Sequence, residues 1–149
     1  MINIYNLDDA SFNDPNEAFP EYIKRNVDSD GYYTLIAIDS GDEEEYFAGA
    51  LQFSVDMTKS GKFFSILRYI YVVPKYRLLN VALRLFAKAE EILTSEEITV
   101  ISADFPYNEE GELISDISEE EIDAFLEGCG FIWTKDTKGA AGYFKFIRR

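Results

Sequence analysis

The join between an apolar run and an amphipathic helix constrains the fold of this chain most. Residues 63–73 read FFSILRYIYVV, and their aromatic and β-branched side chains are typical of a buried strand. Pro74 follows, and apolar residues then recur at helical spacing from about Tyr76 to Leu93. A helix that starts at the carboxyl end of a strand presents unpaired N–H groups there, so the join predicts an anion-binding turn.

The predicted helix has two different faces. Its apolar stripe, which we expect to pack on a sheet, contains Leu79, Ala82, Leu83, Phe86, Ala89 and Leu93. The opposite stripe is polar and contains Arg77, Asn80, Arg84, Lys88 and Glu91. Arg77, in the first turn, offers a planar pair of donors for phosphate oxygens, although it could also pair with an acidic neighbour.

The remaining pattern predicts one domain, 1–149, around a single sheet. The order of elements is β-α-β-β-β-α-β-α-β-β, in which Ser118 and Glu121 have the spacing of a helix capping box. The further strands are expected at 2–7, 31–39, 45–57, 98–105, 131–136 and 141–149, and the further helices at 14–27 and 118–128. This order predicts an α/β or α+β fold with a mostly antiparallel sheet of about six to seven strands flanked by helices.

Charge is distributed unevenly along the chain. The net charge is −14, yet residues 57–89 contain no Asp or Glu and carry seven of the 14 Lys and Arg residues. This segment is therefore expected to attract an anion, although a solvated helix face would give the same pattern. The acidic total argues against nonspecific binding to nucleic acid or to an anionic membrane. The start of the chain lacks the features of a secretory signal and no run of about 18 apolar residues occurs, so we expect a cytoplasmic protein.

The absence of histidine restricts the chemistry. Ser-His-Asp triads, Cys-His dyads and imidazole acid–base catalysis are excluded, and metal sites lose their commonest ligand, so no metal is expected. The single cysteine, Cys129, has no basic neighbour in the sequence and is more often a small packed residue than a nucleophile.

Residues 70–86, IYVVPKYRLLNVALRLF, resemble the acetyl-CoA motif of the GNAT-type N-acetyltransferase superfamily. In that motif a strand reading L-x-V-x-P-x-Y-R leads into R/Q-x-x-G-x-G/A and then a helix, and the element order from Tyr32 to Arg149 also fits. The resemblance implies a GNAT-like acyl-CoA-binding domain with acetyl-CoA as acyl donor. It further implies that the strand holds the pantetheine arm and that the turn's N–H groups hold the pyrophosphate. The residues so implied are Ile70, Tyr71, Val72, Arg77, Leu78, Leu79, Asn80, Val81 and Ala82.

Several positions depart from the family's pattern. Asn80 replaces the motif glycine, and Asn is among the residues that tolerate left-handed backbone angles. Leu126 stands where members of the superfamily commonly carry a tyrosine that protonates the departing thiolate. An acidic insertion, EEGELISDIS at 109–118, also lengthens the segment between Asn108 and Gly130.

The resemblance implies transfer of an acetyl or other small acyl group from acetyl-CoA to a primary amine by direct attack. Asp104 is the candidate base and Tyr107 or Tyr143 the candidate acid, although a loop-capping carboxylate and core tyrosines would explain the same residues. Outside residues 57–89 the chain is acidic, and this negative charge favours a cationic acceptor. The expected partners are thus a small-molecule or peptide amine, with no nucleic acid and no membrane, for a monomer or homodimer. The alternatives are a catalytically inactive GNAT-fold binding or regulatory module and, more remotely, an acidic mimic of nucleic acid.

Overall fold

The computed structural model describes residues 1–7, 19–41, 44–77, 79–105, 109–110, 113, 115–135 and 141–147. The strands are β1 (Ile2–Asn6), β2 (Tyr32–Ser40), β3 (Glu45–Met57), β4 (Phe63–Val72), β5 (Val100–Ala103), β6 (Ile132–Lys135) and β7 (Ala141–Phe146). The helices are α2 (Glu21–Asn26), α3 (Val81–Ser95) and α4 (Glu119–Gly128), with a short 3-10 turn, η2, at Pro74–Tyr76.

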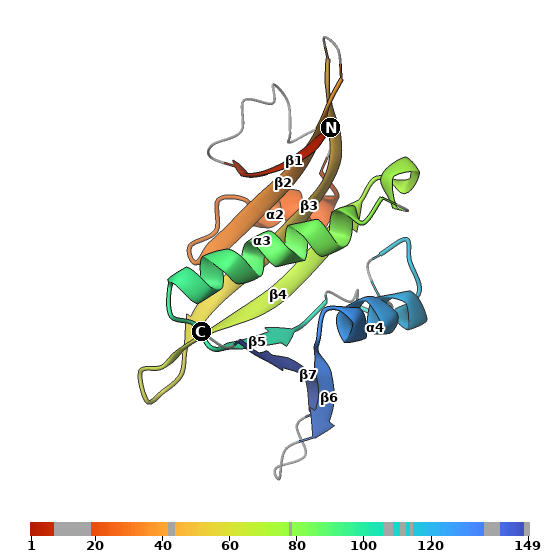
Figure 1. Ribbon diagram of the computed structural model, residues 1–149. Helices are drawn as coiled ribbons and strands as arrows, with labels where there is room; N and C mark the ends of the chain where they lie inside the picture. Colours follow the sequence, from red (N-terminus) through yellow and green to blue (C-terminus); the bar gives the residue numbers. More distant parts are fainter. Residues whose placement is uncertain are drawn as a thin grey trace.

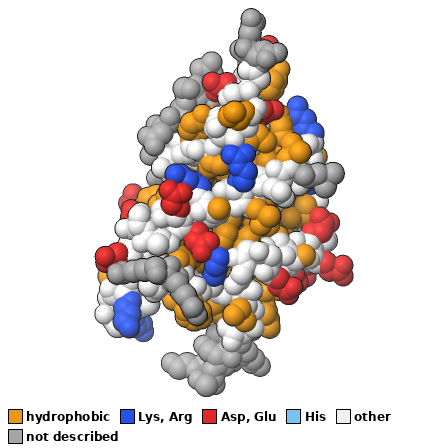
Figure 2. Space-filling model, in the orientation of Figure 1, with side chains coloured by type: hydrophobic (Ala, Val, Ile, Leu, Met, Phe, Trp, Pro, Cys, Tyr) orange, Lys and Arg blue, Asp and Glu red, His pale blue; other side chains and the backbone are white. Residues whose placement is uncertain are grey.

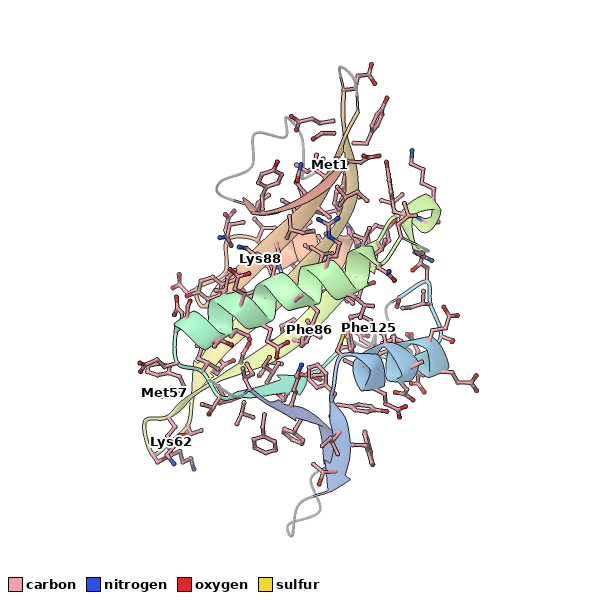
Figure 3. The ribbon with its side chains drawn as sticks, viewed as in Figure 1. Met1, Met57, Lys62, Phe86, Lys88 and Phe125 are labelled. Carbon is pink, nitrogen blue, oxygen red and sulfur yellow. The ribbon has the colours of Figure 1, made fainter. Side chains whose placement is uncertain are left out.

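The strands form one seven-stranded sheet in the order β1-β2-β3-β4-β5-β7-β6 (Figure 1). The pairing of β4 with β5 is parallel and the other five pairings are antiparallel. The predicted fold class, a mostly antiparallel sheet flanked by helices, is confirmed. Met57 and Lys62 mark the β3–β4 hairpin, at the end of the sheet away from α4 (Figure 3).

Helices pack on both faces of the sheet. α3 lies across β1 to β4, and α2 packs on the opposite face, where the fully buried Gln52 donates one amide hydrogen to the Ile23 carbonyl at 3.1 Å. The buried residues of α3 are Val81, Leu85, Phe86, Ala89 and Leu93. The predicted apolar stripe is therefore wrong at Leu79 and Leu83, whose exposed fractions are 56% and 44%.

The cause of this shift is the point at which α3 begins. We predicted a helix from about Tyr76, but η2 at Pro74–Tyr76 comes first and Asn80 then takes left-handed angles, φ 58° and ψ 25°. α3 starts only at Val81, so Leu79 lies before the helix. Val81 is therefore the first residue of α3 that is buried against the sheet. α2 likewise starts late, directly after Pro20, whereas the start of the helix predicted at 14–27 lies outside the described residues.

Candidate functional site

The site begins where β4 leaves β5. Leu67 and Tyr69 pair with the adjacent residues Phe53 and Gln52 of β3, so Arg68 is an extra residue, a β-bulge that bends the strand. The parallel pairing of β4 with β5 ends at Leu67 and Ala103, after which the Asp104 amide donates to the Leu67 carbonyl at 3.0 Å. β4 continues to Val72 while β5 has ended, which leaves room beside the last residues of β4.

The space beside the last residues of β4 is a pocket of about 160 Å³. Its floor comes from β4 and its walls from the start of α3, the segment 115–117 and α4. In Figure 2 hydrophobic side chains are visible between α3 and α4, with acidic side chains over α4 at the right. Phe125 extends from α4 toward α3 in Figure 3. The lining residues are Ile70, Tyr71, Val72, Arg77, Ala82, Ser115, Asp116, Ile117, Glu121, Ile122 and Phe125.

The structure brings five of the nine predicted cofactor residues together in this pocket: Ile70, Tyr71, Val72, Arg77 and Ala82. Asn80 forms the left-handed turn that precedes α3, the conformation that the motif glycine would take readily. By contrast, the side chain of Leu79 is exposed and that of Val81 is fully buried in the core, so only their backbone could contribute. Leu78 lies outside the described residues.

The start of α3 offers donors to an anion. The first backbone hydrogen bond of α3 runs from the Arg84 amide to the Asn80 carbonyl at 3.1 Å. The amides of Val81, Ala82 and Leu83 come before this bond and therefore have no acceptor within the helix. The first turn, Val81–Arg84, contains no acidic residue. The helix dipole and the N–H groups that have no acceptor within α3 therefore both favour a negative group at this turn.

Arg77 lines the same pocket as Ala82, which lies in the first turn of α3. Its Nε donates to the Val72 carbonyl at 2.8 Å, its guanidinium lies 5.9 Å from the centre of the Tyr71 ring, and its Nη2 pairs with the Asp116 carboxylate. The Arg77 side chain is 30% exposed, so part of it remains accessible from outside. Arg77 is thus held against Val72, Tyr71 and Asp116 rather than extended into solvent.

A second pocket, of about 310 Å³, lies on the other side of α4, against β5, β6 and β7. Ile122 lines both pockets. Two predicted catalytic residues, Asp104 and Tyr143, meet here, and Tyr107 lies outside the described residues. The lining comprises Ala103, Asp104, Phe105, Leu113, Glu119, Ile122, Asp123, Leu126, Trp133, Gly142 and Tyr143.

The two candidates differ in their surroundings. Asp104 is 69% exposed and pairs with Arg68 at 3.4 Å, while Arg68 also bonds Ser54 Oγ at 3.0 Å. Tyr143 packs edge-on against Trp133, with ring centres 5.2 Å apart. Partial burial and the neighbouring Asp123 carboxylate raise the pKa of the Tyr143 hydroxyl, so this phenol keeps its proton at neutral pH.

α4 carries no proton donor where the family pattern has its tyrosine. Leu126 is 2% exposed and belongs to the core, and Phe125 lines the smaller pocket. Cys129 is buried, and this burial raises the pKa of its thiol to about 12, which removes it as a nucleophile.

Comparison with known proteins identifies the fold. The sequence matches no protein-family model and no curated protein. The solved structure of the KacTA–DNA complex aligns over 99% of this chain and 94% of its own, with TM-score 0.69 and 16% identity. AtaTR bound with acetyl-CoA aligns over 98% and 93%, with TM-score 0.66 and 14% identity. A protein from Desulfovibrio desulfuricans assigned to the GNAT family of acetyltransferases aligns over 99% and 100%, with TM-score 0.64 and 16% identity. This chain has the GNAT fold.

The partner prediction made from the sequence is wrong. It allowed only an amine acceptor and a second copy of the chain, without nucleic acid or membrane. The KacTA complex contains DNA, and AtaT has been solved with the C-terminus of the antitoxin AtaR, so proteins of the GNAT fold also assemble with proteins and DNA. The prediction rested on net charge, which disfavours direct nonspecific contact with DNA but says nothing about specific protein partners or about DNA bound through them.

Sequence reasoning missed the part of the site that comes from the insertion. Ser115, Asp116 and Ile117 all line the smaller pocket, and Asp116 pairs with the arginine that the motif identifies. The only signal was the acidic composition of residues 109–118, which gives no indication of where the segment folds back.

Two general features hold for the described part of the chain. None of its helices combines the length and the apolar character needed to cross a bilayer. Its Cys, Asp and Glu side chains do not gather in any group of three or more that could hold a metal ion.

Proposed function

We propose that this protein transfers an acetyl or other small acyl group from acetyl-CoA to a primary amine. One observation carries the proposal: Arg77 and, from the first turn of α3, Ala82 line one apolar pocket beside β4, and this turn follows the left-handed Asn80 and contains no acidic residue. Related folds support it, because AtaTR was solved with acetyl-CoA and the NatC complex with CoA and a Gag peptide.

The residues present suit the parts of this donor. The diphosphate would be held by Arg77 and the amides at the start of α3, where donors and dipole both favour an anion. The pantetheine arm would lie along Ile70, Tyr71 and Val72, and the small side chain of Ala82 leaves space opposite them. When bound, acetyl-CoA supplies a thioester whose carbonyl an amine can attack.

The acceptor would be activated near the point where β4 and β5 diverge. The amine has to attack in its neutral form, so a carboxylate such as Asp104 would take its proton, directly or through water. Tyr143 keeps its hydroxyl proton and lines the larger pocket, so it would donate a hydrogen bond toward the departing sulfur once the thioester extends past Ile122, which lines both pockets. Tyr107 is the other candidate for this role. Asp104, Glu119 and Asp123 line the larger pocket together with Trp133 and Tyr143, which favours a cationic acceptor.

The first step, binding of the acyl donor, is tested by calorimetry of acetyl-CoA with the wild type and with the Arg77→Glu variant. We expect heat of binding for the wild type and a large loss of affinity in Arg77→Glu, because the substitution replaces a phosphate donor by a repelling carboxylate. Equal binding by both proteins would exclude Arg77 from the site. No binding by either at millimolar acetyl-CoA would refute the proposed function.

Turnover is measured by the reaction of the released CoA thiol with a disulfide reagent. The buried Cys129 should react little with this reagent and so add little background. A panel of cationic and neutral amines, including lysine-containing peptides and aminoglycosides, tests the acceptor. Faster turnover of the cationic members would support the acidic pocket as its site. Binding without turnover of any amine would favour a non-catalytic role.

A further inference from the structure

The segment 115–117 reaches across the chain to the candidate cofactor site. Asp116 lies 39 residues beyond Arg77 in the sequence, yet their side chains form an ion pair at the end of the smaller pocket. Ile117 and Ser115 on either side of Asp116 also line that pocket. The pair is therefore part of a packed segment and not a contact between two freely rotating surface side chains.

Neighbouring contacts fix this segment. The Ile117 amide donates to Ser115 Oγ at 3.2 Å, and the Ser115 amide donates to the Leu113 carbonyl at 3.0 Å. Burial raises the pKa of the Tyr69 phenol, beside the bulge of β4, and the nearby Ser115 hydroxyl opposes this rise, so Ser115 lies close to Tyr69. These bonds present the carboxylate of Asp116 toward Arg77.

We propose that Asp116 is a specificity-determining residue that competes with the diphosphate of the acyl donor for Arg77. This inference rests on the proposed function. The Nε of Arg77 is already bonded to the Val72 carbonyl, so the remaining donors of the guanidinium face either the carboxylate or a phosphate oxygen. A second carboxylate, Glu121, lines the same pocket and adds to the repulsion of a bound anion.

The competition makes a sharp distinction between ligands. A donor that carries the diphosphate has to share Arg77 with Asp116 or displace it, and has to approach two carboxylates. Pantetheine, which has the same arm and thiol but no phosphate, meets the apolar floor of the pocket and leaves the ion pair intact. Removing the charge of Asp116 should therefore strengthen binding of CoA and leave binding of pantetheine unchanged.

The experiment compares wild type, Asp116→Asn and Glu120→Gln by calorimetry with CoA and with pantetheine. Glu120 is exposed on the first turn of α4, lines neither pocket, and controls for the loss of one negative charge. We expect Asp116→Asn to lower the Kd for CoA by about two- to fivefold, a size typical of partly exposed charge pairs, and the effect should shrink at high salt. Glu120→Gln should match the wild type with both ligands.

The double variant Asp116→Asn with Arg77→Gln tests the mechanism of the gain. If Asp116 acts through Arg77, most of the gain disappears in the Arg77→Gln background. Equal CoA affinity of Asp116→Asn and wild type would overturn the inference while the proposed function stands. An equal gain for pantetheine would also overturn it, because the phosphate would then not be involved. Failure of every protein to bind CoA would refute the proposed function, and the inference with it.

Discussion

Gly49 of β3 is the position where a single added methyl group should disturb the site most. A Cβ at Gly49 would lie 2.7 Å from the Tyr71 carbonyl oxygen, 3.3 Å from the Val72 Cα and 3.5 Å from Leu85 Cδ1. The two nearest atoms belong to the backbone of β4, which cannot move aside as a flexible side chain can. Gly49→Ala should therefore push β3 and β4 apart where β4 lines the smaller pocket.

The cost follows from the contact distances. Overpacking of this kind destabilises proteins by about 1–3 kcal/mol, and a backbone contact of 2.7 Å places Gly49→Ala near the middle of that range, at about 2 kcal/mol. For a chain of this size such a loss corresponds to a decrease in Tm of roughly 4–8 °C. The urea midpoint, followed by circular dichroism, should fall by about 1 M with little change in slope.

A matched control is Gly128→Ala. Gly128 ends α4, an added Cβ there has no heavy atom within 4 Å, and alanine favours a helix over glycine. This variant should be unchanged or more stable by up to about 1 kcal/mol. If Gly49→Ala unfolds within about 0.5 kcal/mol of wild type, β3 and β4 are not held as closely as the structure indicates. Acetyl-CoA binding should weaken in Gly49→Ala and stay unchanged in Gly128→Ala.

Three further predictions concern single positions. Asn80→Val should lower stability by about 1–2 kcal/mol, because a β-branched side chain opposes left-handed angles, whereas Asn80→Gly should stay within about 1 kcal/mol; equal Tm values would contradict this. Burial and the 2.8 Å bond to Asp39 raise the pKa of Tyr76 from 10.0 to about 12, so the stability it contributes is complete below pH 10 and disappears as pH rises toward 12. Urea midpoints between pH 9 and 12 should show this loss in wild type and a smaller one in Tyr76→Phe. Asp104→Asn should lower kcat by about a hundredfold if this carboxylate is the base, and unchanged kcat would remove it from that role.

Local sequence patterns predicted the elements well because each depends on neighbouring residues. The strand predicted at 45–57 and the capping box at Ser118 and Glu121 appear in the structure as β3 and as the N-cap of α4. The start of α3 was less predictable, because helical spacing continues back through Leu79 and does not show that Asn80 turns left-handed. The burial of α3 then changed with its starting point, so Val81 and Leu85 replaced Leu79 and Leu83 on the face toward the sheet.

The candidate site likewise contains residues that are close in sequence, which could be predicted, and residues that are distant in sequence, which could not. The motif pointed to β4, Arg77 and the turn at Asn80, which are close in sequence, and β4, Arg77 and Ala82 line one pocket. Asp116 could not be found this way, since its contact with Arg77 depends on how the chain returns after β5. The most informative departure from the family pattern is therefore the acidic insertion rather than Asn80. Asn80 keeps the required backbone geometry, whereas Asp116 changes which charge faces the arginine.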